Sequence, residues 1–376
     1  MSLTSTSTGT ITSPQALDEI PTPAAVVDLA RMRANLDRMA DYAAHHALAL
    51  RPHTKTHKSP EMAKEQLRRG AAGVTVATVR EAEVMAAVAH DILLAYPPVG
   101  PGKIERLLAL PEDVRLTVAL DSREALEMVA RAASAAGREI GVLVELDLGM
   151  RRVGIGDPVA AATLARRACD RAAVEYRGIT FYPGHIREPV PQQTAALDRL
   201  KEELGRFLEI FQRDGLTPVT VSGGSTPTAF ASHQLDALTE IRPGTYIFND
   251  RTTAQVGACA WEDCAYTVLA TVVSTAVPGQ AVVDAGSKAL TREELRAPEA
   301  TGFGALFDRR DVAVKALSEE HGLLDLSRTD WRPRIGDRVR IVPNHVCVSV
   351  NMHTRVWGLE GDEVRESWEV AARGWT

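Results

Sequence analysis

Short apolar runs alternate with longer amphipathic stretches over the first two thirds of the chain. The apolar runs fit buried strands, and the Ala-, Glu- and Arg-rich stretches between them carry apolar residues at helical spacing. The predicted strands are residues 47–51, 73–77, 91–95, 116–120, 142–146, 178–182, 218–221 and 244–248. The predicted helices are residues 29–46, 80–90, 122–136, 158–172 and 195–214.

About eight strands that alternate with helices predict an α/β protein with a parallel (β/α)8 TIM-type barrel. A doubly wound open sheet is the alternative architecture. The pattern then becomes β-rich, with Gly and Pro between the runs, at residues 266–276, 280–284, 338–342 and 346–352. This change predicts a second, mainly antiparallel β domain. We therefore expect the barrel over residues 25–254 and the β domain over residues 1–24 and 255–376.

Composition narrows the classes of function. The formal net charge is −6, and Lys and Arg are scattered among Asp and Glu, so we expect no nucleic-acid partner. No apolar run approaches the ~20 residues that span a membrane, and residues 1–14 form a polar Ser/Thr-rich leader, which together predict a cytoplasmic protein. Four irregularly spaced cysteines predict free thiols rather than a disulfide framework.

The first candidate for chemistry follows the first predicted barrel strand, in the run Arg51-Pro-His-Thr-Lys-Thr-His-Lys58. Catalytic residues of barrels lie at the carboxyl ends of strands. A lysine held there among other cations and partly desolvated keeps some of its amine neutral, and the neutral amine attacks aldehydes. Lys55 is the candidate nucleophile, and Lys58 lies about one helical turn further on; a solvated basic loop is the alternative interpretation.

A glycine-rich loop follows the seventh predicted strand and contains Ser222, Gly223, Gly224, Ser225 and Thr226. Glycines let the backbone approach a ligand closely, and several N–H groups and hydroxyls would converge on an anion there. Phosphate sites recur after strands seven and eight of barrels. We therefore predict a phosphate cradle, with a simple turn as the alternative, and Tyr246 lies beside it in the following segment.

Two further strand ends carry candidate groups. Arg151 and Arg152 follow the fifth predicted strand and could pair with a phenolate or a carboxylate, or form a surface ion pair. Tyr182 and His185 follow the sixth, where Tyr182 could contact a ring and His185 could act as an acid or base. A structural role is the alternative for His185.

The run Pro343-Asn-His-Val-Cys347 lies in the predicted β domain. If residues 346–352 form a strand, His345 and Cys347 alternate and point to the same face. Imidazole and thiolate together suit zinc, and two protein ligands would leave positions open for water or substrate. The sequence therefore predicts a catalytic metal pair, with two core residues as the alternative.

Taken together, these motifs resemble the D-threonine aldolase and D-serine dehydratase family of fold type III pyridoxal-phosphate enzymes, whose barrel is similar to that of alanine racemase. The resemblance covers nearly the whole chain, because six motifs occur in the same order. They are Arg51-Pro-His-Thr-Lys55, Ser222-Gly-Gly-Ser-Thr226, Arg242-Pro-Gly-Thr-Tyr246, Asp284-Ala-Gly286, Glu320-His-Gly322 and Pro343-Asn-His-Val-Cys347.

The resemblance implies roles for these residues. Lys55 would form a Schiff base with pyridoxal phosphate, loop 222–226 and Tyr246 would hold the phosphate, and Arg152 would lie near the phenolic oxygen. Tyr182 would approach the pyridine ring, while His345 and Cys347 would bind a divalent metal, zinc or manganese. The N-terminal strand would join the β domain, and a head-to-tail homodimer is expected.

The implied activity is that of a lyase acting on small D-3-hydroxy amino acids. Pyridoxal chemistry stabilises a carbanion at Cα, and a metal polarises the β-oxygen. If His185 or another base takes the hydroxyl proton, glycine and an aldehyde result, although the spacing of His185 departs from that of the aldolase histidine of the family. If Lys55 takes the α-proton instead, the products are a keto acid and ammonia.

The sequence leaves open whether the protein is an aldolase or a dehydratase, and we take the aldolase as the first hypothesis. In the family, cysteine at position 347 goes with dehydratases and aspartate with aldolases, whereas the run Phe181-Tyr-Pro-Gly-His185 is closer to the aldolases. A racemase and a non-catalytic pyridoxal-phosphate carrier are further alternatives. The racemase would need a tyrosine acid/base from the β domain, and the carrier would need no β domain.

Overall fold

The computed structural model describes residues 15–295 and 301–374, so the polar leader 1–14 lies outside the described residues. The chain forms two compact units. The β unit takes the chain up to Asn35, Ile247–Gln255 and Cys259–Arg373, and the barrel unit takes Leu36–Tyr246 with Val256–Ala258. The predicted limits of the cofactor domain, 25–254, stay a prediction.

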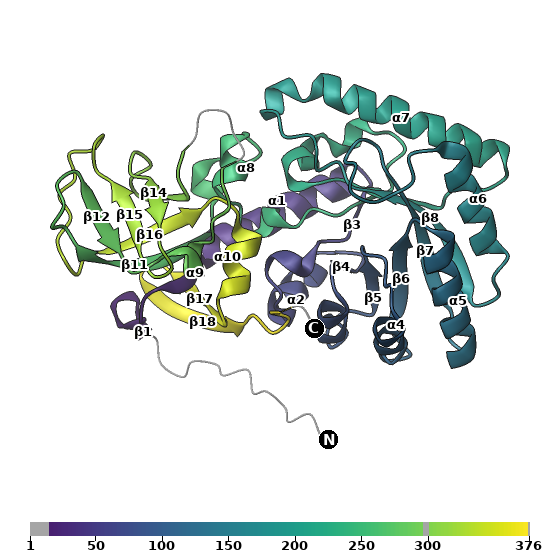
Figure 1. The fold of residues 1–376 in the computed structure, drawn as a ribbon, viewed down its shortest axis with the longest axis horizontal. Coiled ribbons are helices and arrows are strands. Elements are labelled where there is room, and N and C mark those ends of the chain that lie inside the picture. Colours follow the sequence, from purple (N-terminus) through teal and green to yellow (C-terminus); the bar gives the residue numbers. More distant parts are fainter. Residues whose placement is uncertain (1–14, 296–300, 375–376) are drawn as a thin grey trace. The chain divides into compact units, whose positions relative to one another are not determined.

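The barrel unit is built on an eight-stranded sheet with the order β3-β10-β9-β8-β7-β6-β5-β4 (Figure 1). Its strands are β3 (Ala49–Leu50), β4 (Val74–Val76), β5 (Asp91–Leu94), β6 (Arg115–Leu120), β7 (Ile140–Leu146), β8 (Val174–Phe181), β9 (Thr220–Gly223) and β10 (Glu240–Ile241). All neighbouring strands in this order pair in parallel.

The two ends of this sheet also meet. The Ala72 N–H donates to the Leu50 carbonyl (2.8 Å) and the Thr75 N–H to the Pro52 carbonyl (2.8 Å). A parallel bridge between His53 and Thr75 continues the contact beyond β3. The sheet therefore curls round on itself, and the predicted (β/α)8 barrel with a mainly antiparallel second domain is confirmed.

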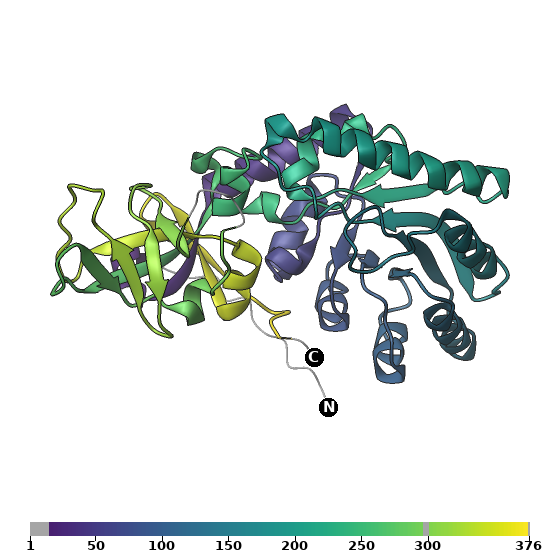
Figure 2. The same ribbon diagram turned by 45° about the horizontal axis from the view of Figure 1, so that its top comes forward.

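The helices of the barrel unit follow the strands in turn: α2 (Pro60–Arg68), α3 (Val79–Met85), α4 (Pro101–Leu108), α5 (Arg123–Ala136), α6 (Pro158–Cys169) and α7 (Thr194–Arg213). Figure 2 shows α4 to α7 on the outer side of the curved sheet. Helix α5 shows why these segments are helical: Ser122 caps its first turn, Leu126, Val129 and Ala133 form a buried stripe, and Gly137 ends it with φ +62°.

The eighth predicted strand was misplaced. The strand is β10 (Glu240–Ile241), and residues Thr245–Ile247 form the 3-10 helix η5 instead of a strand over 244–248. Pro243 has no N–H to donate to a neighbouring strand, so the ladder stops there. Gly244 then packs closely on the loop after β3, because a Cβ at Gly244 would lie 3.0 Å from the His53 carbonyl oxygen.

The β unit is a mainly antiparallel sheet (Figure 1). Its strands are β1 (Gln15–Ala16), β2 (Ala24–Asp28), β11 (Tyr266–Ser274), β12 (Gln280–Val283), β13 (Gly304–Leu306), β14 (Val314–Leu317), β15 (Gly322–Asp325), β16 (Arg338–Pro343), β17 (Arg355–Glu360) and β18 (Glu363–Glu369). Strand β2 pairs antiparallel with β11 and parallel with β17, so the N-terminal strand lies inside this sheet as expected. Helix α1 (Leu29–His45) follows β2, and α8 (Arg251–Gln255) and α9 (Ser287–Leu290) are short helices.

The expected strand over 346–352 is wrong: these residues form helix α10 (Val346–Met352). The run is rich in β-branched valine, which favours a strand locally. In the structure Val346, Ser349 and Val350 are buried at spacings of three and four residues, which is the pattern of a helix face. Burial of that face outweighs the local preference for a strand.

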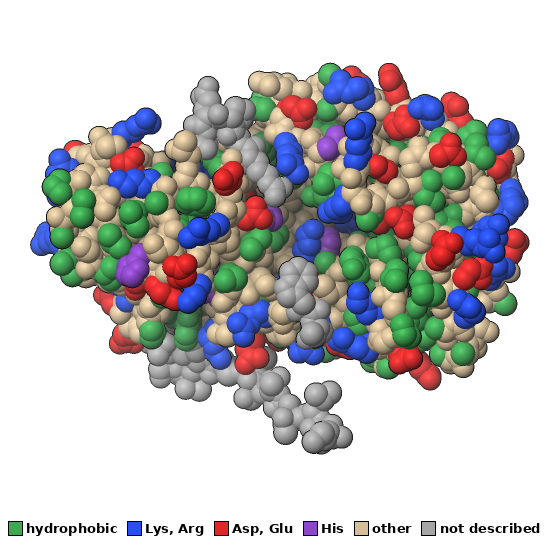
Figure 3. Space-filling model, in the orientation of Figure 1, with side chains coloured by type: hydrophobic (Ala, Val, Ile, Leu, Met, Phe, Trp, Pro, Cys, Tyr) green, Lys and Arg blue, Asp and Glu red, His purple; other side chains and the backbone are tan. Residues whose placement is uncertain are grey.

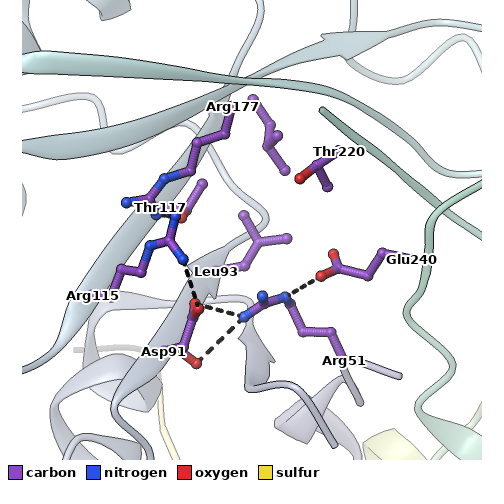
Figure 4. A pocket seen from close by; sticks show the side chains of 9 residues that line it. Arg51, Asp91, Leu93, Arg115, Thr117, Arg177, Thr220 and Glu240 are labelled. Carbon is purple, nitrogen blue, oxygen red and sulfur yellow. Dashed lines mark hydrogen bonds and ion pairs between the residues drawn. The ribbon is translucent and has the colours of Figure 1, made fainter. Parts of the chain in front are cut away.

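The amino-terminal end of the barrel interior is occupied by charged side chains (Figure 4). Arg51 contacts Asp91 (2.8 Å) and Glu240 (2.6 Å), and the Arg177 guanidinium lies where a Cβ on Gly141 would be. The cavity between these groups has a volume of about 60 Å³. Because paired charges fill this end, a site for substrate chemistry belongs at the opposite, carboxyl end of the strands.

Charged residues of both signs are interspersed on the face shown in Figure 3. None of the helices in the described parts of the chain is long and apolar enough to cross a membrane.

Candidate active site

Three of the predicted residues meet at the carboxyl ends of β3, β7 and β8. The Lys55 ammonium nitrogen lies 5.8 Å from the centroid of the Tyr182 ring, and the Arg152 guanidinium carbon lies 5.1 Å from it. Gly184 leaves room for this ring, because a Cβ there would lie 2.1 Å from a Tyr182 ring carbon. Lys55 and Arg152 thus both lie near the Tyr182 ring, and two cations beside one aromatic ring suit an anionic, planar ligand.

Lys58 is held in a different way. Its ammonium nitrogen lies 2.7 Å from Glu81 Oε1 in a buried ion pair, and Glu81 Oε2 accepts the Ala77 N–H at 2.6 Å. Both side chains are largely excluded from water. Since the Lys58 amine is bound to Glu81, the amine of Lys55 is the better placed of the two for reaction with an aldehyde.

The surroundings of Lys55 include buried groups with unused hydrogen-bonding capacity. His53 Nδ1 and Glu145 Oε2 have no partner among the described residues. Burial lowers the pKa of His53 well below its usual value, and the charges of Lys55 and Arg242 lower it further. Burial raises the pKa of Glu145, although Arg242 and Arg152 oppose this. A bound polar ligand would provide partners for these atoms.

Loop 222–226 lies at the end of β9, as predicted. Gly224 has φ +93°, a conformation that favours glycine. The Ser222 hydroxyl already has partners inside the barrel, because it donates to Glu240 Oε1 (2.5 Å) and accepts from Arg242 (2.8 Å). Ser225 and Thr228 share a hydrogen bond of 3.0 Å, and the buried Thr226 hydroxyl has no partner among the described residues. That hydroxyl suits a phosphate oxygen.

Tyr246 lies on η5, in the segment that follows β10. Its hydroxyl accepts a hydrogen bond of 3.0 Å from Gln66 Nε2, and burial raises its pKa. A phenol in this state stays protonated and can donate a hydrogen bond to an anion.

His185 is exposed and packs on the loop after β7 rather than on the Lys55 group. A Cβ at Gly149 would lie 3.0 Å from His185 Nε2. Desolvation lowers the pKa of His185, although Glu188 and Asp147 oppose this. No contact between His185 and Lys55, Arg152 or Tyr182 is found among the described residues, so its role as a base stays a prediction.

The predicted metal pair comes together in the β unit even though the expected strand is a helix. His345 is the N-cap residue of α10, and Cys347 lies in the first turn. The two side chains are hydrogen-bonded to one another. Burial alone lowers the pKa of His345, but the charges of Cys347 and Asp250 outweigh it and hold this pKa well above its usual value. The pair therefore favours a positive charge, which a divalent metal would supply.

Asp250 is a site residue that the sequence patterns did not reveal. Its Oδ2 lies 3.1 Å from His345 Nδ1 and accepts the Val346 N–H at 3.1 Å, and its Oδ1 accepts the Thr253 N–H at 2.8 Å. The carboxylate is fully buried. It therefore caps α10 and leaves His345 Nε2 as the nitrogen for a ligand. The one local signal was an acid two residues after the apolar run 246–248.

Within residues 15–295 and 301–374, no group of three or more His, Cys, Asp or Glu side chains is arranged to hold a metal. Asp250 supports His345 but is not placed as a third ligand. A metal at His345 and Cys347 would therefore keep positions open for water or substrate, as catalytic sites do.

A parallel barrel with a lysine after its first strand, followed by an antiparallel unit with its own polar site, defines the class of fold type III enzymes. Comparison with known proteins supports this assignment. Residues 27–252 match the family model described as alanine racemase, N-terminal domain, and residues 265–359 match a serine dehydratase domain model.

Individual relatives cover both units. D-threonine aldolase of Arthrobacter sp is 32% identical over 96% of this chain and 94% of its own. D-threo-3-hydroxyaspartate dehydratase of Delftia sp. (strain HT23) is 34% identical, and the match covers 95% of this chain and 98% of that protein. The crystal structure of D-threonine aldolase from Filomicrobium marinum superposes with a TM-score of 0.87 at 34% identity, covering 96% of this chain and 98% of that one. A mutant of a D-threo-3-hydroxyaspartate dehydratase has been solved in a metal-free form, with a TM-score of 0.88 at 32% identity over 96% of this chain and 100% of that one.

The chain belongs to the alanine racemase N-terminal-domain family and, within it, to the group that contains D-threonine aldolase and D-threo-3-hydroxyaspartate dehydratase. The predicted resemblance and the predicted enzyme class, a lyase of this group, are confirmed.

Proposed function

We propose that this protein cleaves small D-3-hydroxy amino acids by a retro-aldol reaction, with pyridoxal phosphate held in the barrel unit and a divalent metal held in the β unit. The observation that carries the proposal is the meeting of Lys55 and Arg152 at the Tyr182 ring, while Lys58 is occupied by Glu81. Pyridoxal phosphate, when bound, supplies an electron sink for charge that develops at Cα of the substrate.

The residues present fit this cofactor. Lys55 would hold its aldehyde carbon, Arg152 its phenolic oxygen and Tyr182 its ring, while Thr226, Tyr246 and the N–H groups of loop 222–226 would hold its phosphate. The buried, unpartnered Thr226 hydroxyl is the direct structural support for an anion there. Gly223 is required by packing, because a Cβ there would lie 2.5 Å from the Phe181 ring, and Gly224 adopts φ +93°.

The donor set of the second site fits zinc or manganese. His345 would bind through Nε2, because Nδ1 is turned to Asp250, and Cys347 would bind through its sulfur. An imidazole and a thiolate suit zinc. A metal at this position would supply a Lewis acid that favours loss of the proton from the β-hydroxyl of the substrate or loss of hydroxide from its β-carbon.

The chain's own groups determine which bond breaks. A neutral base that takes the β-hydroxyl proton leads to cleavage of Cα–Cβ, giving glycine and an aldehyde. We propose His185 for this step, and the lowered pKa of His185 supports it because the ring is then neutral and able to accept a proton.

Dehydration is the second candidate reaction, and Cys347 favours it. If the Lys55 amine takes the α-proton, the β-hydroxyl takes up a proton and leaves as water, and hydrolysis of the resulting enamine then gives a keto acid and ammonia. A thiolate ligand suits zinc better than manganese. Zinc is a strong Lewis acid for departure of a hydroxyl group.

The structure argues against a racemase. A racemase of this fold would need a tyrosine acid/base from the β domain, and residues 255–376 contain one tyrosine, Tyr266. Its side chain is fully buried, and its hydroxyl is hydrogen-bonded to Ser349 (2.9 Å). Tyr266 is therefore unavailable to exchange protons with a substrate. A carrier role has no support either, because the relatives that span both units are enzymes.

We also propose a homodimer and a cytoplasmic location. The dimer rests on the family resemblance, and sedimentation of the 40.6 kDa chain would decide it. The location is supported by the four cysteines, which are free thiols as in a reducing compartment.

Product analysis tests the proposed reaction. Purified protein with pyridoxal phosphate and zinc or manganese is incubated with D-threonine, D-serine and D-3-hydroxyaspartate. Glycine with an aldehyde is the expected result, and a chelator should abolish it. A keto acid with ammonia would replace the aldolase proposal by the dehydratase, and full turnover without metal would remove the role of His345 and Cys347.

A further inference from the structure

A line of hydrogen bonds runs through the interior of the barrel unit from the loop after β3 to Tyr246. The Ser59 N–H donates to His57 Nδ1 (3.1 Å), His57 Nε2 pairs with Gln66 Oε1 (3.2 Å), and Gln66 Nε2 donates to the Tyr246 hydroxyl (3.0 Å). His57, Gln66 and Tyr246 are exposed by 0%, 1% and 3% respectively. Water therefore does not compete for these bonds.

The polarity of this line is fixed from one end. A backbone N–H can only donate, so His57 Nδ1 must accept, and burial lowers the pKa of His57 to about 4, which leaves the ring neutral. The remaining ring proton is therefore on Nε2 and is donated to Gln66 Oε1. This bond turns the Gln66 amide so that its NH2 group, which can only donate, faces the Tyr246 oxygen.

This orientation of the Gln66 amide determines how the Tyr246 hydroxyl can form hydrogen bonds. Its oxygen accepts from Gln66, so its own proton must be donated to something else. Among the described residues the Tyr246 hydroxyl has no second partner. The segment that carries it follows β10, and at the start of this segment the Arg242 N–H donates to the Gly223 carbonyl of the glycine-rich loop (3.0 Å).

We infer that His57 and Gln66 are positioning residues that make the Tyr246 hydroxyl an obligate hydrogen-bond donor to the phosphate group in loop 222–226. This inference rests on the proposed cofactor and adds two residues that do not touch it. A phosphate presents acceptors alone at neutral pH, so a phenol free to reverse its hydrogen bond would spend part of its time without a useful bond to it. The hydrogen bonds from His57 through Gln66 prevent the Tyr246 hydroxyl from reversing in this way.

A packing role is the competing explanation, because all three side chains are buried. Two substitutions of Gln66 separate the explanations. Gln66→Glu keeps the shape but presents a carboxylate that accepts from both neighbours, so Tyr246 would turn its proton toward residue 66. Gln66→Met is similar in volume and removes the amide without offering an acceptor, so Tyr246 would stay able to donate to the phosphate.

The measurement is the dissociation constant of pyridoxal phosphate for the full-length apoprotein, followed by protein fluorescence. We expect Tyr246→Phe and Gln66→Glu each to weaken binding about tenfold, the usual loss for a hydrogen bond to a charged group, and Gln66→Met to weaken it by about threefold or less. In a Tyr246→Phe background, Gln66→Glu should add little, since the donor is already absent. That background also measures the effect of the new charge alone.

Equal losses for Gln66→Glu and Gln66→Met, or full additivity of Gln66→Glu with Tyr246→Phe, would overturn the inference and leave a packing role. Thermal unfolding of each apoprotein shows whether a variant is folded before its affinity is compared. If the wild-type protein itself does not bind pyridoxal phosphate, the proposed function fails, which is a separate result from failure of the inference.

Discussion

Lys55 and Lys58 lie three residues apart, yet the structure gives them different surroundings. Lys55 faces the ring of Tyr182, whereas Lys58 is paired with the buried Glu81 carboxylate. The sequence alone favoured Lys55 because it directly follows the strand. The structure adds a physical reason, since the Lys58 side chain is held in place by its buried contact with Glu81.

This difference predicts opposite effects of two substitutions. Lys55→Ala should abolish the visible absorbance that pyridoxal phosphate gains when it is joined to a lysine, with little change in stability because Lys55 has no buried partner among the described residues. Lys58→Ala should keep the absorbance but lower the free energy of unfolding by about 3 kcal/mol, because Glu81 is left buried and unpaired. Absorbance spectra and urea unfolding of both variants check this; retained absorbance in Lys55→Ala would move the attachment to another lysine.

The residues that the sequence missed share one property. Asp250, Gln66 and His57 are buried and act through other side chains rather than on a ligand. Asp250 contacts a histidine 95 positions away, and Gln66 contacts a tyrosine 180 positions away. Strand ends and glycine-rich loops can be recognised in a linear pattern, but the identity of a distant partner depends on how the chain packs. The convergence of Lys55, Arg152 and Tyr182 was predictable because a barrel brings strand ends together.

At the scale of elements, most predicted strands and helices are found within a few residues of their expected positions. The two errors, at 244–248 and 346–352, lie in segments rich in β-branched and aromatic residues. In both cases contacts with distant segments determine the structure. Asp250 is one such contact, because it accepts the first N–H of α10 and holds the side chain of the N-cap residue.

Asp250 therefore links the position of α10 to the proposed metal pair. We expect Asp250→Asn to weaken metal binding by about 10- to 100-fold, as loss of a hydrogen-bonded carboxylate behind a metal-binding histidine does. The amide keeps the size of the side chain, so the β unit should remain folded. Metal affinity, measured by competition with a chromophoric chelator, checks this prediction.

Glu369→Gln is a suitable control for Asp250→Asn, because it removes an exposed acid on β18, elsewhere in the β unit and outside the proposed pair. It should leave metal affinity within about twofold. If Asp250→Asn binds metal as tightly as the wild type, His345 does not depend on Asp250 for its orientation.

At the scale of the whole molecule, the alternation of strands and helices was sufficient to predict the barrel and the β unit. The closure of the barrel depends on more than the alternation. The hydrogen bonds of Ala72 to β3 and of Thr75 to the loop after it join the edges of the barrel, and arginines paired with Asp91, Glu240 and Glu175 fill its amino-terminal end. Because every arginine there has a carboxylate partner, this end contributes to the fold rather than to ligand binding.

Buried neutral histidines give the folded molecule a defined response to pH. The pKa of His57 falls from 6.5 to about 4 on burial, and burial also lowers the pKa of His53. Below pH 6.5 the unfolded chain therefore takes up protons that the folded chain does not, so stability is fully present above that pH and is lost as the pH falls toward 4. The raised pKa of His345 acts in the opposite direction, with stability lost as the pH rises.

A comparison with His57→Asn isolates the contribution of one group. From about pH 7 to about pH 5, His57 alone should remove about 2 kcal/mol from the free energy of unfolding, since one unit of pKa shift corresponds to about 1.4 kcal/mol. The variant lacks the titrating ring, so its free energy of unfolding should fall by about 2 kcal/mol less than that of the wild type over the same interval. Urea unfolding of both proteins at the two pH values measures the difference. Parallel pH profiles would mean that the folded protein binds a proton at His57 as readily as the unfolded chain, and that Nδ1 does not stay an acceptor for the Ser59 N–H at acidic pH.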